Sequence, residues 1–126
     1  GRSALENIML GMRFLGLSYS EIKKKSQEAL ARVGLEHKAN TPVENMSWGE
    51  NQRLSIARAI ARKPAIILAD EPTGNLDKEN AIKILDLLSS CKDSNTAVII
   101  PTHATHLIPQ NQSRIIRLNS GVMEES

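Results

Sequence analysis

Aromatic residues are scarce in this 126-residue chain, which has one Phe, one Tyr and one Trp. Proteins that bind single-stranded nucleic acid stack the bases on several aromatic side chains, so this mode of binding is excluded. The formal net charge is +2, and its 16 basic and 14 acidic residues are interspersed, unlike the basic stripe of a nucleic-acid-binding surface. We therefore expect no nucleic-acid partner and a core of aliphatic side chains.

Cysteine and long apolar runs are also lacking. Cys91 is the one cysteine, so no disulfide can form within the chain, and a reducing compartment fits. No apolar run approaches the roughly 18 residues that a membrane-spanning helix needs. With 40% hydrophobic and 24% charged residues, the composition is that of an ordinary globular protein or of part of one.

The first 62 residues carry apolar positions at helical spacing and predict three helices. The first is expected over Ala4–Leu15, where Gly16 interrupts the pattern. Ser20 is the expected N-cap of the second helix, and Gly34 its C-terminal stop. The third is expected over Glu50–Arg62. Residues 1–62 are therefore interpreted as a helical subdomain.

Beyond residue 62 the period changes to that of strands. The apolar run Ala65–Ala69 suits a strand that is buried on both faces of a parallel sheet. The segments Ala97–Ile100 and Arg114–Leu118 predict two more strands, and Asp77 is expected to cap a helix between the first two. Strand, helix and strand in this order predict an α/β fold with parallel pairing for residues 63–126.

Two adjacent carboxylates, Asp70 and Glu71, follow the first apolar strand directly. In nucleotide hydrolases the first acid at such a strand end helps to hold a magnesium ion. The second acid can orient or deprotonate a water next to the terminal phosphate. The alternative interpretation is an acid pair that only caps the following turn.

A hydroxyl and a glycine stand before the third helix, in the sequence Ser47-Trp48-Gly49-Glu50. The free N–H groups at a helix N-terminus can bind an anion. Ser47 and Glu50 also fit a plain capping box, and on these residues alone that structural interpretation is the favoured one.

His103 follows the second apolar strand, at the strand end where open α/β sheets bind ligands. A solvated loop histidine is the alternative interpretation. His103 and His106 could also form a metal pair, but no further Cys or His lies near them in the sequence. No metal site is therefore expected between the two.

Together, in this order and spacing, the motifs resemble those of the ABC-type ATPases. Residues 47–50 are similar to the signature motif of that family, and residues 70–71 to the Walker B aspartate with its catalytic glutamate. Residues 74–77, Gly-Asn-Leu-Asp, resemble the D-loop, and His103 resembles the switch histidine. The string 69–77 is similar to one subgroup, the lipoprotein-release, macrolide-export and cell-division ATPases.

The resemblance implies a helical subdomain followed by the C-terminal part of a P-loop NTPase core. It implies that two subunits, arranged head to tail, enclose two ATP molecules. Asp70 would support Mg²⁺, Glu71 would polarise the attacking water, and His103 would contact the terminal phosphate. Asp77 would lie across the dimer interface. The residues expected to contact the ATP of the other subunit are Ser47, Gly49 and Glu50.

The resemblance also implies coupling of hydrolysis to transport. The helical half would dock on transmembrane permease subunits, and the protein would be cytoplasmic and peripheral on the inner face of the cell membrane. An alternative is a non-catalytic module of the same family that acts by docking or dimerisation. The head of a chromosome-segregation or DNA-repair ATPase is a third option, which residues 74–77 fit less well.

The chain departs from the family pattern in three places. No glycine-rich stretch ends in Gly-Lys-Ser or Gly-Lys-Thr, so the usual cradle for the β and γ phosphates is absent from these 126 residues. Trp48 replaces the first glycine of the signature pair, and Pro101 precedes Thr102 and His103. In the family's sheet the strand leading to the cradle lies between the strands expected here at 97–100 and 114–118. We therefore expect a slot between those two.

The 126-residue chain by itself should not hydrolyse ATP at a measurable rate, because positioning of the phosphates supplies most of the catalysis in this chemistry. Phosphate release from the purified chain in the presence of Mg²⁺ measures this. The Glu71→Gln chain is the control for contaminating ATPases. Turnover that copurifies with the chain and disappears in that variant would contradict the prediction.

Overall fold

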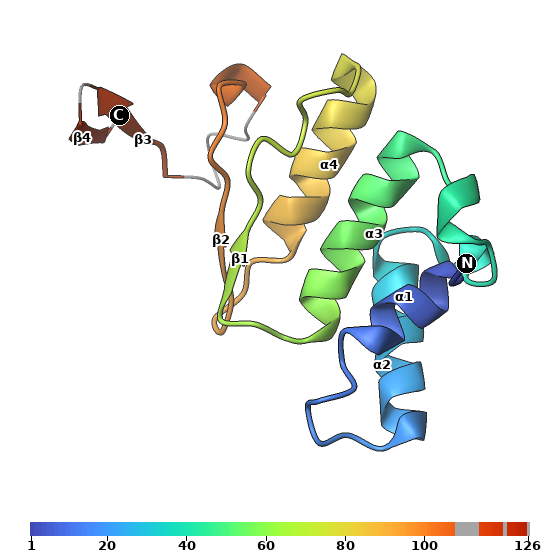
Figure 1. Ribbon diagram of the computed structural model, residues 1–126. Coiled ribbons are helices and arrows are strands. Elements are labelled where there is room, and N and C mark those ends of the chain that lie inside the picture. The colour runs from blue at the N-terminus through green and yellow to red at the C-terminus, as the bar shows by residue number, and fades with distance from the viewer. Residues whose placement is uncertain (108–113, 120, 126) are drawn as a thin grey trace.

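The computed structural model describes residues 1–107, 114–119 and 121–125 and has the expected α/β architecture (Figure 1). The helices are α1 (Ala4–Leu10), α2 (Tyr19–Arg32), α3 (Trp48–Ala61) and α4 (Lys78–Ser90). The strands are β1 (Ile66–Leu68), β2 (Ala97–Ile99), β3 (Ile116–Asn119) and β4 (Val122–Glu125). Short 3₁₀ turns lie at Glu36–Lys38, Val43–Asn45 and Thr105–Leu107.

The first three helices pack on one another, and α3 also packs on α4, which lies beside β1 and β2 (Figure 1). The core is aliphatic, as expected, and one continuous cluster runs through both halves of the chain. Its members include Ile8, Leu30, Leu54, Ile67 and Leu88. The division at residue 62 stays a prediction. Within the described residues, no helix is long and apolar enough to span a bilayer.

The start of α2 corrects the prediction from the sequence. Ser18, not Ser20, is the N-cap, because Ser18 has the extended backbone that a cap requires and its Oγ accepts the Glu21 N–H at 3.2 Å. Ser20 lies within the first turn. The expected stop at Gly34 is confirmed: its φ of +76° is a left-handed conformation that glycine adopts without a steric penalty.

The first helix is shorter than predicted and ends at Leu10, with Gly11 as its C-cap. The chain then turns, so Met12 still reaches the core while Leu15 is 42% exposed. Apolar spacing alone could not show this break, because Gly11 and the turn after it keep Met12 on the buried side.

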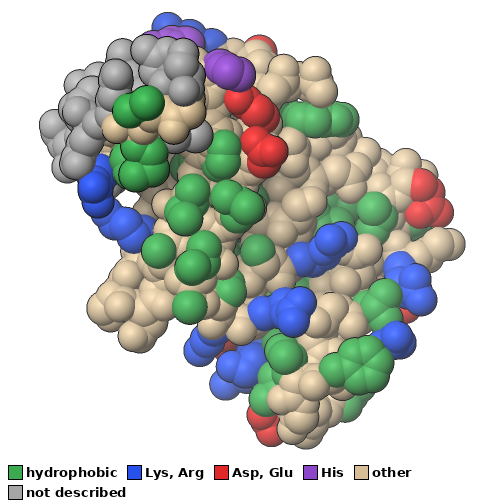
Figure 2. Space-filling model, turned by 60° about the vertical axis from the view of Figure 1, so that its left-hand side comes forward, with side chains coloured by type: hydrophobic (Ala, Val, Ile, Leu, Met, Phe, Trp, Pro, Cys, Tyr) green, Lys and Arg blue, Asp and Glu red, His purple; other side chains and the backbone are tan. Residues whose placement is uncertain are grey.

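The parallel pairing of β1 with β2 is confirmed, with Ile67 opposite Val98. The expectation that β1 is buried on both faces is wrong: Ile67 is buried, whereas Ile66 and Leu68 are 60% and 67% exposed. In the described part of the chain, helices cover one face of this two-stranded sheet only. Figure 2 brings the sheet side forward and shows apolar side chains gathered on the molecular surface there.

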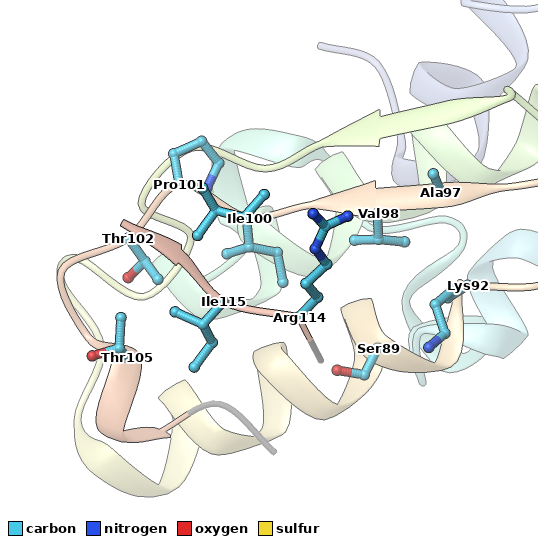
Figure 3. A pocket seen from close by; sticks show the side chains of 11 residues that line it. Ser89, Lys92, Ala97, Val98, Ile100, Pro101, Thr102, Thr105, Arg114 and Ile115 are labelled. Carbon is cyan, nitrogen blue, oxygen red and sulfur yellow. The ribbon is translucent and has the colours of Figure 1, made fainter. Parts of the chain in front are cut away.

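Strand β3 does not pair with β2 but forms an antiparallel hairpin with β4. A cavity of about 370 Å³ lies between α4, β2 and the residues that lead into β3. Figure 3 shows Ile100 on one side of it and Ile115 on the other. This position agrees with the slot expected between the two strands.

Lys63, the residue after the C-cap of α3, has a φ of +49°. A left-handed conformation costs a residue with a Cβ about 1–2 kcal/mol. Glycine avoids this steric cost but loses more backbone entropy on folding, so the net gain from a glycine is smaller. Lys63→Gly should therefore raise the free energy of unfolding by about 0.5–1 kcal/mol, measured by urea denaturation. Lys63→Ala keeps the strain and loses the charge, so it should not stabilise the chain. Equal shifts in the two variants would contradict this account.

Candidate functional site

The parallel pairing of β1 and β2 places the residues after both strands at one edge of the sheet. The ladder continues past the strands, because the Ala69 N–H donates to the Ile99 carbonyl at 3.0 Å. Asp70, Glu71 and His103 are therefore brought to the same edge from two segments far apart in the sequence.

Glu71 has an unusual backbone conformation, with a φ of +44°. A residue with a side chain pays about 1–3 kcal/mol for such a conformation, so surrounding contacts must maintain it. One contact is the hydrogen bond from the Glu71 N–H to the Pro101 carbonyl, at 2.8 Å. Pro101 lies beyond the end of β2 and supplies its carbonyl, so its missing N–H is no obstacle to this contact.

The Glu71 carboxylate is held by the turn that follows β2. Its Oε1 accepts the His103 backbone N–H at 2.9 Å, and its Oε2 accepts the Thr102 hydroxyl at 3.4 Å. The His103 imidazole is fully exposed, and its Nε2 lies 3.8 Å from Oε1. Backbone and hydroxyl donors thus orient the carboxylate, while its side chain stays 41% exposed and open to a water or a ligand.

Asp70 is exposed at the end of β1. Within the described residues there is no group of three or more Asp, Glu, His or Cys side chains that could hold a metal ion. This does not conflict with a magnesium role, because Mg²⁺ is commonly bound by one or two carboxylates together with the phosphates of a nucleotide. The carboxylate of Asp70 fits that chemistry.

Ser47 and Glu50 form the capping box that the sequence predicts for residues 47–50. The Ser47 Oγ accepts the Glu50 N–H at 3.1 Å, and the Glu50 Oε1 accepts the Ser47 N–H at 2.9 Å. The hydrogen bond from the Ser47 backbone lowers the pKa of Glu50, and the Lys38 ammonium 3.4 Å from its other oxygen lowers it further. Trp48, the first residue of α3, is 47% exposed.

A groove of about 330 Å³ joins the start of α3 to α4. Ser47, Gly49 and Glu50 line it together with Leu76, the residue before Asp77. Asp77 caps α4 as predicted, since its side chain accepts the Asn80 N–H at 2.9 Å. The signature and D-loop segments, which lie 24 residues or more apart in the chain, thus border one surface hollow.

The fold leaves the signature residues Ser47, Gly49 and Glu50 separate from the carboxylates of Asp70 and Glu71. Among the described residues, no hydrogen bond or ion pair joins Ser47, Gly49 or Glu50 to the edge that holds Glu71. A polar link between the two regions comes from Gln52 of α3, whose side chain donates to the Pro72 carbonyl at 3.3 Å.

Sequence reasoning missed two residues of this site. The sequence indicates Thr102 only as the neighbour of His103, yet its hydroxyl contacts the Glu71 carboxylate. It indicates no role for Gln52, yet the Gln52 side chain connects α3 to the turn after Glu71. Their polar side chains next to the motifs were the one available signal, because both contacts join residues 20 or more positions apart.

The chain is similar to known ATP-binding proteins. The family model described as ABC transporter matches residues 2–74. The lipoprotein-releasing system ATP-binding protein LolD of Ehrlichia chaffeensis is 41% identical over 96% of this chain and 52% of its own length. The cell division ATP-binding protein FtsE of Streptococcus pneumoniae is 37% identical over 99% of this chain and 55% of its own length.

The same fold is found among solved structures. The dimeric post-hydrolysis state of the ATP-binding cassette MJ0796, bound to ADP and Pi, matches with a TM-score of 0.78 and 36% identity. That match covers 98% of this chain and 56% of the cassette. The chain thus spans about half the length of the relatives it matches. The family model, the sequence relatives and the solved cassette agree, and the chain belongs to the ABC transporter family.

Proposed function

We propose that this chain is the downstream part of an ABC-type ATP-binding cassette that hydrolyses ATP to drive transport. The observation that carries the proposal is the Glu71 carboxylate. It is held by donors to both oxygens at the end of a parallel strand, directly after the exposed Asp70. A turn-capping acid would not need a strained backbone, whereas a residue that must face a substrate gains from one.

In this proposal each residue at the sheet edge has a separate role in ATP hydrolysis. Glu71 orients and polarises the attacking water through an oxygen lone pair that its two donors leave free. Asp70 supports Mg²⁺, which neutralises phosphate charge when ATP is bound. His103, whose imidazole is exposed beside Glu71, contacts the terminal phosphate. The cradle for the other phosphates lies outside these 126 residues.

The separation of the signature residues from Glu71 supports a head-to-tail dimer. Ser47, Gly49 and Glu50 lie at an exposed helix N-terminus, where backbone N–H groups and the helix dipole favour an anion. Because they do not reach the carboxylates of their own chain, we assign them to the ATP held by a second cassette. Asp77, which directly follows the hollow-lining Leu76, is assigned to the dimer interface. The similar MJ0796 cassette is dimeric.

A transport role is supported by the relatives LolD and FtsE, which are ATP-binding proteins of a lipoprotein-releasing system and of cell division. We infer that the complete protein binds transmembrane permease subunits through the helical part formed by α1, α2 and α3. We infer a location in the cytoplasm, peripheral on the inner face of the membrane. A non-catalytic family module that acts by docking alone is the competing function.

Replacement of Glu71 by Gln distinguishes the two functions. In a complete cassette carrying this chain, Glu71→Gln should slow hydrolysis by roughly 10²–10⁴-fold, because an amide cannot accept the proton of the water. ATP binding should persist, since the amide keeps an acceptor and lacks the negative charge that repels phosphate. Phosphate release and equilibrium ATP binding are the measurements. Wild-type turnover in the variant would reduce Glu71 to a capping acid.

Replacement of Ser47 by Asp separates capping from ATP contact. Asp caps helices about as well as Ser, so the free energy of unfolding should change by no more than about 0.5 kcal/mol. The new carboxylate would face the phosphates of the second cassette and should abolish ATP-induced dimerisation, which sedimentation measures. Ser47→Thr, which keeps a neutral cap, is the matched control. If the Asp variant dimerises with ATP as the wild type does, the assignment in trans is wrong.

A further inference from the structure

Thr102 lies at the centre of the turn that holds Glu71. The residue before it, Pro101, accepts the Glu71 backbone N–H at 2.8 Å, and the residue after it, His103, donates its backbone N–H to Glu71 Oε1 at 2.9 Å. The Thr102 hydroxyl itself lies 3.4 Å from Glu71 Oε2. Three consecutive residues thus contact Glu71 at its backbone and at both side-chain oxygens.

The direction of the Thr102 bond follows from its second partner. The Ala104 N–H donates to the Thr102 Oγ1 at 3.0 Å, so this oxygen already serves as an acceptor. A hydroxyl has a single proton to donate, and an ionised carboxylate can only accept. The proton of Thr102 is therefore directed at Oε2 of Glu71. Thr102 is partly buried, which limits competition from water for that proton.

We propose that Thr102 is a positioning residue for Glu71, which sets the plane of its carboxylate. The His103 N–H alone fixes one oxygen and leaves the carboxylate free to rotate about its last side-chain torsion, which is broad in glutamate. A second donor on the other oxygen fixes that plane and hence the direction of the remaining lone pairs. The proposal rests on the proposed role of Glu71, because positioning matters only if Glu71 addresses a water.

The competing interpretation is that the Thr102 hydroxyl serves the turn alone, through the bond from Ala104. Threonine side chains commonly accept a backbone N–H two residues on, without any further role. The two interpretations differ in whether the loss of the hydroxyl loosens the Glu71 carboxylate. They also differ in whether the loss matters once Glu71 can no longer act as a base.

The first experiment measures amide hydrogen exchange by NMR on the 126-residue chain, and it needs no catalysis. Thr102→Val keeps the shape of the side chain without its hydroxyl, and Thr102→Ser keeps the hydroxyl. We expect the His103 amide to exchange about tenfold faster in the Val variant, because one hydrogen bond is weakened. In the Ser variant we expect it to exchange at the rate of the wild type. The Ala69 and Ala97 amides of the β1–β2 ladder report that the sheet stays folded. Unchanged His103 exchange in Thr102→Val overturns the proposal.

The second experiment is a double-mutant cycle in a complete cassette carrying this chain. Thr102→Val should lower kcat on the order of tenfold to 10²-fold with KM unchanged, and Thr102→Ser should restore it. In the Glu71→Gln background the same change should have no further effect on kcat, because the carboxylate that Thr102 positions is absent. Thr105→Val, which removes a neighbouring hydroxyl that does not contact Glu71, is the control.

The outcomes of the two experiments are distinct. Additive effects of Thr102→Val and Glu71→Gln on kcat overturn the positioning role. Full turnover in Glu71→Gln alone would instead overturn the proposed function, and the exchange rates would still show whether Thr102 fixes that carboxylate. Faster His103 exchange together with non-additive kcat values supports both.

Discussion

The hydrogen-bond ladder between β1 and β2 is the interaction on which the arrangement of the site depends. The ladder does not stop at the strand ends but continues through Ala69 to the bond between Glu71 and Pro101. A parallel ladder fixes both the register and the edge at which two chain segments emerge. The carboxylate that we assign as catalytic is thus located by main-chain bonds, which a change of surface residues does not disturb.

The left-handed backbone of Glu71 shows how this location is maintained. The conformation is unfavourable in itself, and it persists because the ladder bond and the donors from Thr102 and His103 hold the residue from three sides. The exposed imidazole of His103 takes no part in holding it beyond the 3.8 Å approach to Oε1. The backbone and the side chain of His103 therefore serve different purposes, and the imidazole is left free to meet a ligand.

The signature motif shows that structural and functional interpretations of a motif need not compete. The Ser47 hydroxyl accepts the Glu50 N–H and the Glu50 carboxylate accepts the Ser47 N–H. The same two residues line the hollow that Leu76 also borders. A capped helix start holds its remaining N–H groups in fixed directions, which is what an anion site requires. The capping box is thus compatible with the proposed contact to ATP, and it gives that contact a rigid support.

What the sequence determined by itself was the set of local features. The apolar periods predicted helices in the regions of α2 and α3. Asp77 and Gly34 predicted a helix start and a helix stop, because caps and stops depend on residues within one turn. The order of the motifs indicated the family. Local signals were ambiguous at the start of α2, where Ser18 and Ser20 are two residues apart, and there the sequence predicted the wrong cap.

The tertiary structure alone decided the contacts between distant segments. Nothing in the residues near Glu71 shows that its oxygens meet Thr102 and the His103 N–H, 31 and 32 positions further on. Nor could the apolar run of β1 show that Ile66 and Leu68 are exposed, since burial depends on what covers each face of a sheet. A sequence pattern records the preference of a residue for burial or for a cap, whereas its partner is set by the register and layering of elements that come together only on folding.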